Sequence, residues 1–309
     1  MSTTPTIIYI VSSGRSGSTF LELLLGAHKD IEAVGELNVL SYECEEGITK
    51  KCGCGSSIHT CGFWGPIIEN HKTVLACNRG VAKFREGKTG WKIIRRGELP
   101  AVFEKRPPEP YDALREFGED NEEIFNAIGE TAEHARGHGI RYIVDASKDF
   151  YRLLWLKHAQ NIRIKVIKIV KDPRAFVYTM AVKNDFGRWK RIALALRMSI
   201  RYIIENILMD RVCAQFDSRD TLRVRYEDLA THPKQEMQRI TAWLGVPYSD
   251  ALVDEFRNTI QHGVAGNEMR HKRTDIRLDE AWKEHAKTLP LKLARLITGR
   301  FARRYGYTL

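Results

Sequence analysis

Short runs of apolar residues alternate along this chain with longer stretches in which apolar positions recur at helical spacing. Four apolar runs predict buried strands, over residues 6–11, 141–145, 165–170 and 222–226. The stretches that separate them predict helices over residues 19–27, 122–136, 151–160, 190–210 and 233–244. Strands that alternate with helices form a parallel sheet covered on both faces. The expected fold class is therefore α/β.

One long segment does not follow this alternation. Residues 43–120 contain five of the six cysteines, several glycine-rich stretches and a proline-rich turn at 106–110. Such a composition favours loops over regular elements. We expect this segment to be an insertion or lid within a single domain that spans residues 1–309.

The charge and the apolar content limit the classes of protein to consider. Lys and Arg number 49 against 39 Asp and Glu, so the net charge is +10. This excess favours an anionic ligand, a nucleic acid or a membrane surface, without choosing among them. No run reaches the ~18 apolar residues that a membrane span needs, and no signal peptide precedes the first strand. We therefore expect a cytoplasmic protein with reduced cysteines.

A polar, glycine-containing loop follows the first predicted strand. It reads Ser12-Ser13-Gly14-Arg15-Ser16-Gly17-Ser18-Thr19 and leads directly into a helix. The glycines allow a tight turn, so that backbone N–H groups and the helix dipole can face an anion. The serine and threonine hydroxyls add donors, and Arg15 adds a fixed charge. The loop lacks the first glycine and the lysine of GxxxxGK[ST], which argues against nucleotide triphosphate hydrolysis.

A second candidate anion site follows the strand at 165–170. Pro173 favours the first turn of a helix, which places Thr179 about two turns after Lys171. These two residues could therefore contact the same anion, one by charge and one through a hydroxyl. Because ligands of parallel sheets bind beyond the carboxyl ends of the strands, we expect both sites to share one crevice.

Together these segments resemble the family of sulfotransferases that use 3′-phosphoadenosine-5′-phosphosulfate (PAPS), with bacterial, carbohydrate-type and tyrosylprotein members. In that family an RSGST segment binds the 5′-phosphosulfate, and an RDPRA…S segment binds the 3′-phosphate. Lys171 and Thr179 have the family's spacing, with Lys for Arg and Thr for Ser. The segments 224–229 (VRYEDL) and 266–270 (GNEMR) also match. The resemblance implies a P-loop NTPase-like sulfotransferase fold and PAPS as the donor.

The resemblance also assigns roles to residues. It implies that the 3′-phosphate contacts Lys171, Thr179 and Arg270. The remaining expected nucleotide-binding residues are Ser13, Gly14, Arg15, Ser16, Gly17, Ser18, Thr19, Tyr226 and Asn267.

The catalytic residues are expected to be Glu36, Lys148 and Arg15. Glu36 matches a family Gly-Glu segment that supplies the base, and Lys148 would neutralise the leaving oxygen. The His base of the cytosolic small-molecule members is absent, since Phe150 stands at its position. Asp145 remains the alternative base.

No metal is expected for sulfuryl transfer, because fixed cations can stabilise its charge. One cluster leaves a metal open elsewhere: Cys52-x-Cys54 with His59 and Cys61 could bind zinc. A disulfide and an ordinary loop cluster are the alternatives.

The expected function is transfer of a sulfuryl group from PAPS to a hydroxyl of a carbohydrate, a lipid or another small molecule. One alternative is a P-loop kinase-like phosphotransferase. The other is a non-catalytic basic protein that binds nucleic acid or a membrane. For the C-terminal segment 291–307, a closing helix is favoured over peripheral membrane contact. We expect no nucleic-acid partner, and the oligomeric state stays open.

Overall fold

The computed structural model describes residues 5–40, 51–76, 94–159, 161–271 and 278–308. Its centre is a five-stranded parallel sheet with the strand order β2-β3-β1-β4-β5. The strands are β1 (Thr6–Ser12), β2 (Ile31–Gly35), β3 (Tyr142–Lys148), β4 (Ile164–Val170) and β5 (Thr221–Arg225). The predicted α/β class with a parallel sheet is confirmed.

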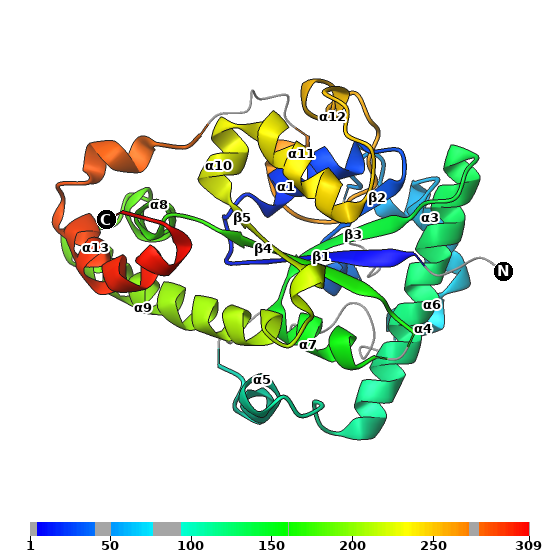
Figure 1. Ribbon diagram of the computed structural model, residues 1–309, viewed down its shortest axis with the longest axis horizontal. Coiled ribbons are helices and arrows are strands. Elements are labelled where there is room, and N and C mark those ends of the chain that lie inside the picture. The colour runs from blue at the N-terminus through cyan, green and yellow to red at the C-terminus, as the bar shows by residue number, and fades with distance from the viewer. Residues whose placement is uncertain (1–4, 41–50, 77–93, 160, 272–277, 309) are drawn as a thin grey trace.

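Helices cover both faces of this sheet (Figure 1). One face carries α1 (Ser18–Gly26), α10 (Tyr226–Thr231), α11 (Pro233–Leu244) and α12 (Ala251–Asp254). The opposite face carries α3 (Trp64–Asn70), α4 (Lys72–Ala76), α5 (Leu99–Glu104), α6 (Tyr111–Arg136), α7 (Phe150–His158) and part of α9 (Arg188–Cys213). At one end of the molecule α8 (Pro173–Val177) and α13 (Leu289–Ala302) pack against α9.

The side chains of β1 alternate between the two faces, as a strand period of two requires. Ile7, Tyr9 and Val11 belong to the cluster under α6 and α7. Ile8 and Ile10 belong to the cluster under α1 and α11. Burial on both sides explains why this strand reads as a continuous apolar run rather than an alternating one.

The segment expected to be an insertion contributes to the core where the structure describes it. Trp64 and Ile67 of α3 are buried in the same cluster as Ile7 of β1. Helix α6 begins at Tyr111, well before the predicted start at 122. Pro110 ends the proline-rich turn and is the residue before the helix, so the whole amphipathic stretch after it can be helical. Residues 41–50 and 77–93 of the segment lie outside the described residues.

The C-terminal segment forms the expected closing helix. Leu291, Ala294 and Phe301 of α13 are buried in one cluster with Tyr202 of α9. Among the described residues, no helix combines the length and the apolar character needed to cross a membrane.

The strand order places the candidate site. β1 pairs with β3 on one side and with β4 on the other. From β1 the chain crosses past β3 to reach β2, and from β3 it crosses past β1 to reach β4, so the connections from these two neighbouring strands leave in opposite directions. In parallel sheets the carboxyl edge at such a switch point forms a crevice for ligands. The loop from β1 to α1 lies there.

Candidate functional site

A cleft of about 940 Å³ opens at this edge of the sheet. That volume suits a ligand of nucleotide size. Its lining comes from the ends of several elements: Ser12, Gly14, Arg15, Ser16, Gly17, Ser18, Thr19, Phe20, Glu36, Lys148, Lys171, Thr179, Met180, Lys183, Arg201, Tyr226, Ala230, Gly266, Asn267, Met269 and Asp279. Basic side chains outnumber acidic ones in this set, so the cleft favours an anion.

The loop between β1 and α1 turns through two left-handed residues, Arg15 with φ 64° and Gly17 with φ 85°. Gly17 is the residue before α1, and no side chain caps the helix there. The first turn of α1 also contains no acidic residue. Its free N–H groups and the positive end of the helix dipole are therefore available to an anion.

Gly17 is required by a close contact as well as by its φ. A Cβ atom on Gly17 would lie 2.3 Å from Cδ2 of Tyr226. Gly14 behaves differently, since it has no positive φ and a Cβ atom there would meet nothing within 4 Å. It lines the cleft without being needed for the turn. Ser13 is buried and is not among the lining residues, which makes it the one loop residue displaced from its expected role.

Lys171 lies behind the loop, on the floor of the cleft. Its Nζ is 3.3 Å from the carbonyl oxygen of Arg15, to which it donates a hydrogen bond, and 4.6 Å from the ring centroid of Tyr226. Only 5% of the residue is exposed, and this burial lowers the pKa of the Lys171 ammonium. Thr179 also lines the cleft, so the structure brings together Lys171 and Thr179, the two residues that the sequence paired.

Thr179 lies in a π-helical turn, Tyr178–Val182, that continues α8. Its hydroxyl donates a 2.8 Å hydrogen bond to the carbonyl oxygen of Ala175, and it can donate to a phosphate only by turning its proton toward the cleft. Lys183 also lines the cleft. Lys183 was missed in the sequence, although its spacing of four residues from Thr179 was a usable signal.

Arg201 was missed as well. It projects from α9, and its Nε donates a 2.6 Å hydrogen bond to Oε1 of the buried Glu205. Nothing in the residues around it distinguishes it from other arginines of this helix. Only the packing of α9 against the sheet places it at the cleft.

Glu36 and Lys148 meet across the cleft. Lys148 Nζ forms an ion pair with Glu36 Oε1, and both side chains are largely buried. Glu36 follows β2, and its backbone N–H donates a 2.9 Å hydrogen bond to the carbonyl oxygen of Val264. Lys148 ends β3 with φ 66°, a conformation that costs a non-glycine residue about 1 kcal/mol or more.

Asp145, the alternative base, points away from the cleft. Its carboxylate accepts hydrogen bonds from the backbone N–H of Ser147 at 2.9 Å and from Nη2 of Arg152 at 3.2 Å. Both Asp145 and Arg152 are fully buried. Asp145 therefore has a structural ion pair and is not among the lining residues.

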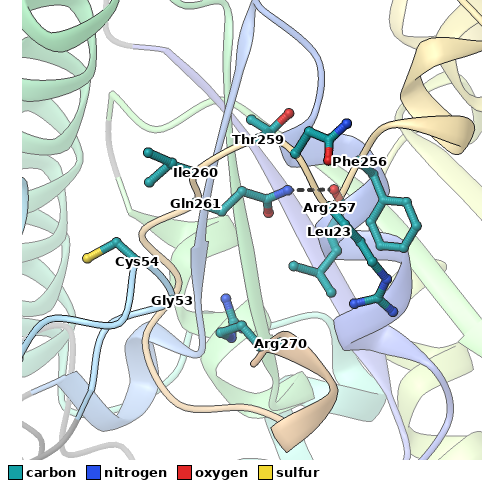
Figure 2. A pocket seen from close by; sticks show the side chains of 10 residues that line it. Leu23, Gly53, Cys54, Phe256, Arg257, Thr259, Ile260, Gln261 and Arg270 are labelled. Atoms are coloured by element: carbon teal, nitrogen blue, oxygen red, sulfur yellow. Dashed lines mark hydrogen bonds between the residues drawn. The ribbon is translucent and has the colours of Figure 1, made fainter. Parts of the chain in front are cut away.

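The structure places Arg270 outside the lining of this cleft. Its guanidinium forms a two-pronged ion pair with Glu22 of α1, at 3.0 to 3.2 Å, and both side chains are buried. It lines a second, smaller pocket with Leu23 and Phe256, shown in Figure 2. The guanidinium that the resemblance assigned to the 3′-phosphate is therefore paired with the buried carboxylate of Glu22.

Other residues of the same segment do reach the cleft. Gly266 and Asn267 line it, and the backbone N–H of Asn267 donates a 3.4 Å hydrogen bond to Oγ1 of Thr19. The segment therefore reaches the cleft through Gly266 and Asn267, while Arg270 binds Glu22 farther along α1.

Comparisons with known proteins agree with this geometry. A family model described as "Sulfotransferase family" matches residues 87–250, which is more than half of the chain. A Caenorhabditis elegans protein, protein-tyrosine sulfotransferase A, is 23% identical over 158 residues. That match covers 48% of this chain and 40% of the relative, so the chain spans less than half of the length of that curated relative.

Solved structures show the same fold. The sulfotransferase domain of the Synechococcus PCC 7002 olefin synthase aligns with a TM-score of 0.55 at 21% identity, covering 99% of this chain and 96% of that one. The sulfotransferase domain from the curacin biosynthetic pathway also aligns with a TM-score of 0.55, at 18% identity over the full length of both chains. The chain accordingly belongs to the sulfotransferase family.

Proposed function

We propose that the protein transfers a sulfuryl group from PAPS to a hydroxyl of an acceptor. One observation carries this proposal. Two groups of anion-binding residues, the β1–α1 loop and the Lys171–Thr179 pair, line a single cleft. PAPS carries phosphate at both the 3′ and the 5′ position of its ribose, so its binding requires two sets of anion-binding residues.

The fit of the donor follows from the residues present. The 5′-phosphosulfate suits the loop, where Ser16, Ser18 and Arg15 combine with the free N–H groups of α1. The 3′-phosphate suits Lys171 and Thr179, and Lys183 replaces Arg270 as the further cation on this side. Tyr226 and Asn267 complete the expected nucleotide contacts.

The chemistry requires a base and a cation near the bond that breaks. The acceptor oxygen attacks sulfur, the bond from sulfur to the phosphate oxygen breaks, and the acceptor proton needs a receiving group. Glu36 supplies a carboxylate for that proton. Lys148 and Arg15 neutralise the charge that develops on the leaving phosphate. The ion pair between Glu36 and Lys148 holds base and cation in the same part of the cleft.

The proposed acceptor class rests on the resemblance to other sulfotransferases. A carbohydrate, a lipid or another small hydroxyl compound is proposed on the resemblance to carbohydrate-type members. A peptide tyrosine is a further candidate, because the matched relative is by name a protein-tyrosine sulfotransferase. A cytoplasmic location is proposed with them.

The direct test is calorimetric titration with adenosine 3′,5′-bisphosphate, the product of the donor, in buffer without magnesium. We expect tight binding that weakens strongly for AMP, which lacks the 3′-phosphate, and again in Lys171→Ala. Lys165→Ala is the matched control, since Lys165 lies near the amino-terminal end of β4, the strand that Lys171 follows, and pairs with Asp220 at 2.9 Å. Transfer of labelled sulfate from PAPS to a panel of acceptors then identifies the acceptor.

A different outcome would favour one of the alternatives. Binding of ATP with magnesium in preference to the bisphosphate would support a kinase. The absence of any nucleotide binding, with steeply salt-dependent binding to nucleic acid or anionic vesicles, would support a non-catalytic basic protein.

A further inference from the structure

Three cysteines and one histidine from distant parts of the chain converge beside α3. They are Cys52, Cys54, Cys61 and His262, and their ligand atoms all lie within 4.8 Å of one another. We propose that these four side chains bind a structural zinc ion. The sequence suggested the three thiols but paired them with His59, which is exposed.

The spacing of these atoms suits a tetrahedral ion. Bonds of ~2.3 Å to sulfur and ~2.0 Å to nitrogen place neighbouring ligand atoms about 3.5 to 3.8 Å apart. The structure has 3.7 Å between the sulfurs of Cys54 and Cys61. It has 3.7 Å from Cys52 Sγ and 3.4 Å from Cys61 Sγ to Nδ1 of His262.

The backbone around the first two cysteines forms a compact turn that presents both thiols to one point. The N–H of Gly55 donates to the carbonyl oxygen of Cys52 at 2.9 Å, and the N–H of Cys52 donates to Ser56 at 2.8 Å. Gly55 has φ 95°, which a glycine adopts without strain. This tight turn lets Cys52 and Cys54, which are separated by one residue, direct their thiols to the same point.

Neighbouring aromatic residues hold the imidazole in place. The ring of Phe63 stacks on that of His262 with centroids 4.7 Å apart and planes 7° apart. Trp64 Nε1 donates a 2.5 Å hydrogen bond to the carbonyl oxygen of the same histidine. The stacking fixes the plane of the imidazole, and the hydrogen bond fixes the backbone that carries it.

The ligand set favours zinc over magnesium and calcium. Three thiolates and one imidazole in tetrahedral array suit Zn²⁺, whereas carboxylate-rich sites suit magnesium or calcium. Cys52 and Cys61 are buried, and all three thiols are unbridged. A single disulfide would use two of the thiols and leave the third and the histidine without a role.

The site ties the cysteine segment to the cleft. Gly53 N–H donates a 3.0 Å hydrogen bond to the carbonyl oxygen of Gly263, and Figure 2 shows Gly53 and Cys54 beside the segment that carries Ile260 and Gln261. Two residues after His262, Val264 pairs with β2 and accepts the hydrogen bond from Glu36. The zinc ion would thus fix the segment that positions the proposed base.

The test is the metal content of the untagged protein, purified from zinc-supplemented medium and measured by mass spectrometry of the elements. We expect about one zinc per chain in the wild type, and a loss of most of it in Cys54→Ser and in His262→Ala. Two controls should retain zinc: Cys213→Ser, a cysteine outside the cluster, and His59→Ala, the ligand that the sequence suggested.

A second measurement does not depend on the folding of the variants. Cobalt(II) added to metal-depleted wild type should give the absorption of tetrahedral thiolate coordination, and zinc should displace it. Wild-type protein with a negligible zinc content and no cobalt spectrum would overturn the proposal, as would a disulfide among the three cysteines. Loss of zinc in His59→Ala with retention in His262→Ala would overturn the assignment of His262.

Discussion

At the scale of single residues, Gly17 is the position where the loop has least freedom. Its φ of 85° and the ring of Tyr226 against its α-carbon both exclude a side chain. Lys171 Nζ lies over the same ring, 4.6 Å from its centroid. The ring of Tyr226 therefore packs against both the turn at Gly17 and the buried ammonium of Lys171.

We expect Gly17→Ala to lower the free energy of unfolding by about 1 to 3 kcal/mol, from backbone strain alone, and more where Tyr226 cannot move. Binding of adenosine 3′,5′-bisphosphate should weaken with it. Urea unfolding and calorimetry measure both effects. Gly14→Ala is the control for stability, since no neighbour opposes a Cβ atom there. Equal stability of the two variants would contradict the role of Tyr226.

Lys171 should make nucleotide binding depend on pH. Burial lowers the pKa of its ammonium, so it loses its proton below the usual lysine value of about 10.4. The charged form binds the anion, and affinity should therefore be full below this lowered pKa and fall as the pH rises through it. Lys171→Arg keeps its charge and should flatten the curve. An unchanged curve in that variant would assign the titration to another group.

At the scale of elements, two carboxylates leave neighbouring strands in different directions. Glu36 follows β2 and faces the cleft, whereas Asp145 in β3 pairs with the buried Arg152. The sequence placed both near the ends of strands and could not separate them. Substitution of Glu36 should therefore affect turnover, whereas substitution of Asp145 should affect stability.

Glu36→Gln should lower kcat about 10²- to 10⁴-fold, since the proton acceptor is lost. Asp145→Asn should instead lower the free energy of unfolding by about 3 to 5 kcal/mol, because Arg152 loses its buried counter-charge. Turnover with the identified acceptor and urea unfolding separate the two effects. Full activity of Glu36→Gln would remove Glu36 as the base.

The ion pair between Glu22 of α1 and Arg270, in the segment after α12, leads to another prediction. Burial raises the pKa of Glu22, and Arg270 opposes that rise. Arg270→Ala should cost about 3 to 5 kcal/mol of stability near neutral pH. The cost should shrink as the pH falls through the raised pKa of Glu22, because the protonated carboxyl tolerates burial.

Urea unfolding at about pH 7.5 and about pH 5.5 tests this dependence. Arg239→Ala is the matched control, since its ion pair with Glu236 is on the surface and should contribute less than about 1 kcal/mol. Normal stability of Arg270→Ala combined with lost bisphosphate binding would support the nucleotide-binding role expected for Arg270 from the sequence.

At the scale of the whole molecule, five cations from distant parts of the chain come together where the parallel strands end. Arg15, Lys148, Lys171, Lys183 and Arg201 line one cleft although they lie far apart in the chain. We expect the affinity for the bisphosphate to fall with added salt, since the Debye length shrinks from ~10 Å at 0.1 M to ~3 Å at 1 M.

AMP, with one phosphate fewer, should show a weaker dependence on salt, as should the Lys171→Ala variant with the bisphosphate. Calorimetry at several salt concentrations gives the slopes. Identical slopes for both nucleotides would place the 3′-phosphate outside the cationic cleft.

The sequence alone determined the features that depend on contiguous residues. The apolar runs predicted four of the five strands and the parallel sheet, because burial on both faces leaves continuous hydrophobic segments. The loop at 12–19 and the spacing of Lys171 and Thr179 predicted two anion sites, because a turn and a short helix set their geometry locally. Family membership followed from the same contiguous motifs.

Only the tertiary structure decided which distant side chains share a site. Arg270 pairs with Glu22, while Lys183 and Arg201 enter the cleft in its place. His262, and not the nearby His59, completes the cysteine cluster. The direction of a side chain depends on how segments hundreds of residues apart pack together, and neither local spacing nor residue type contains that information.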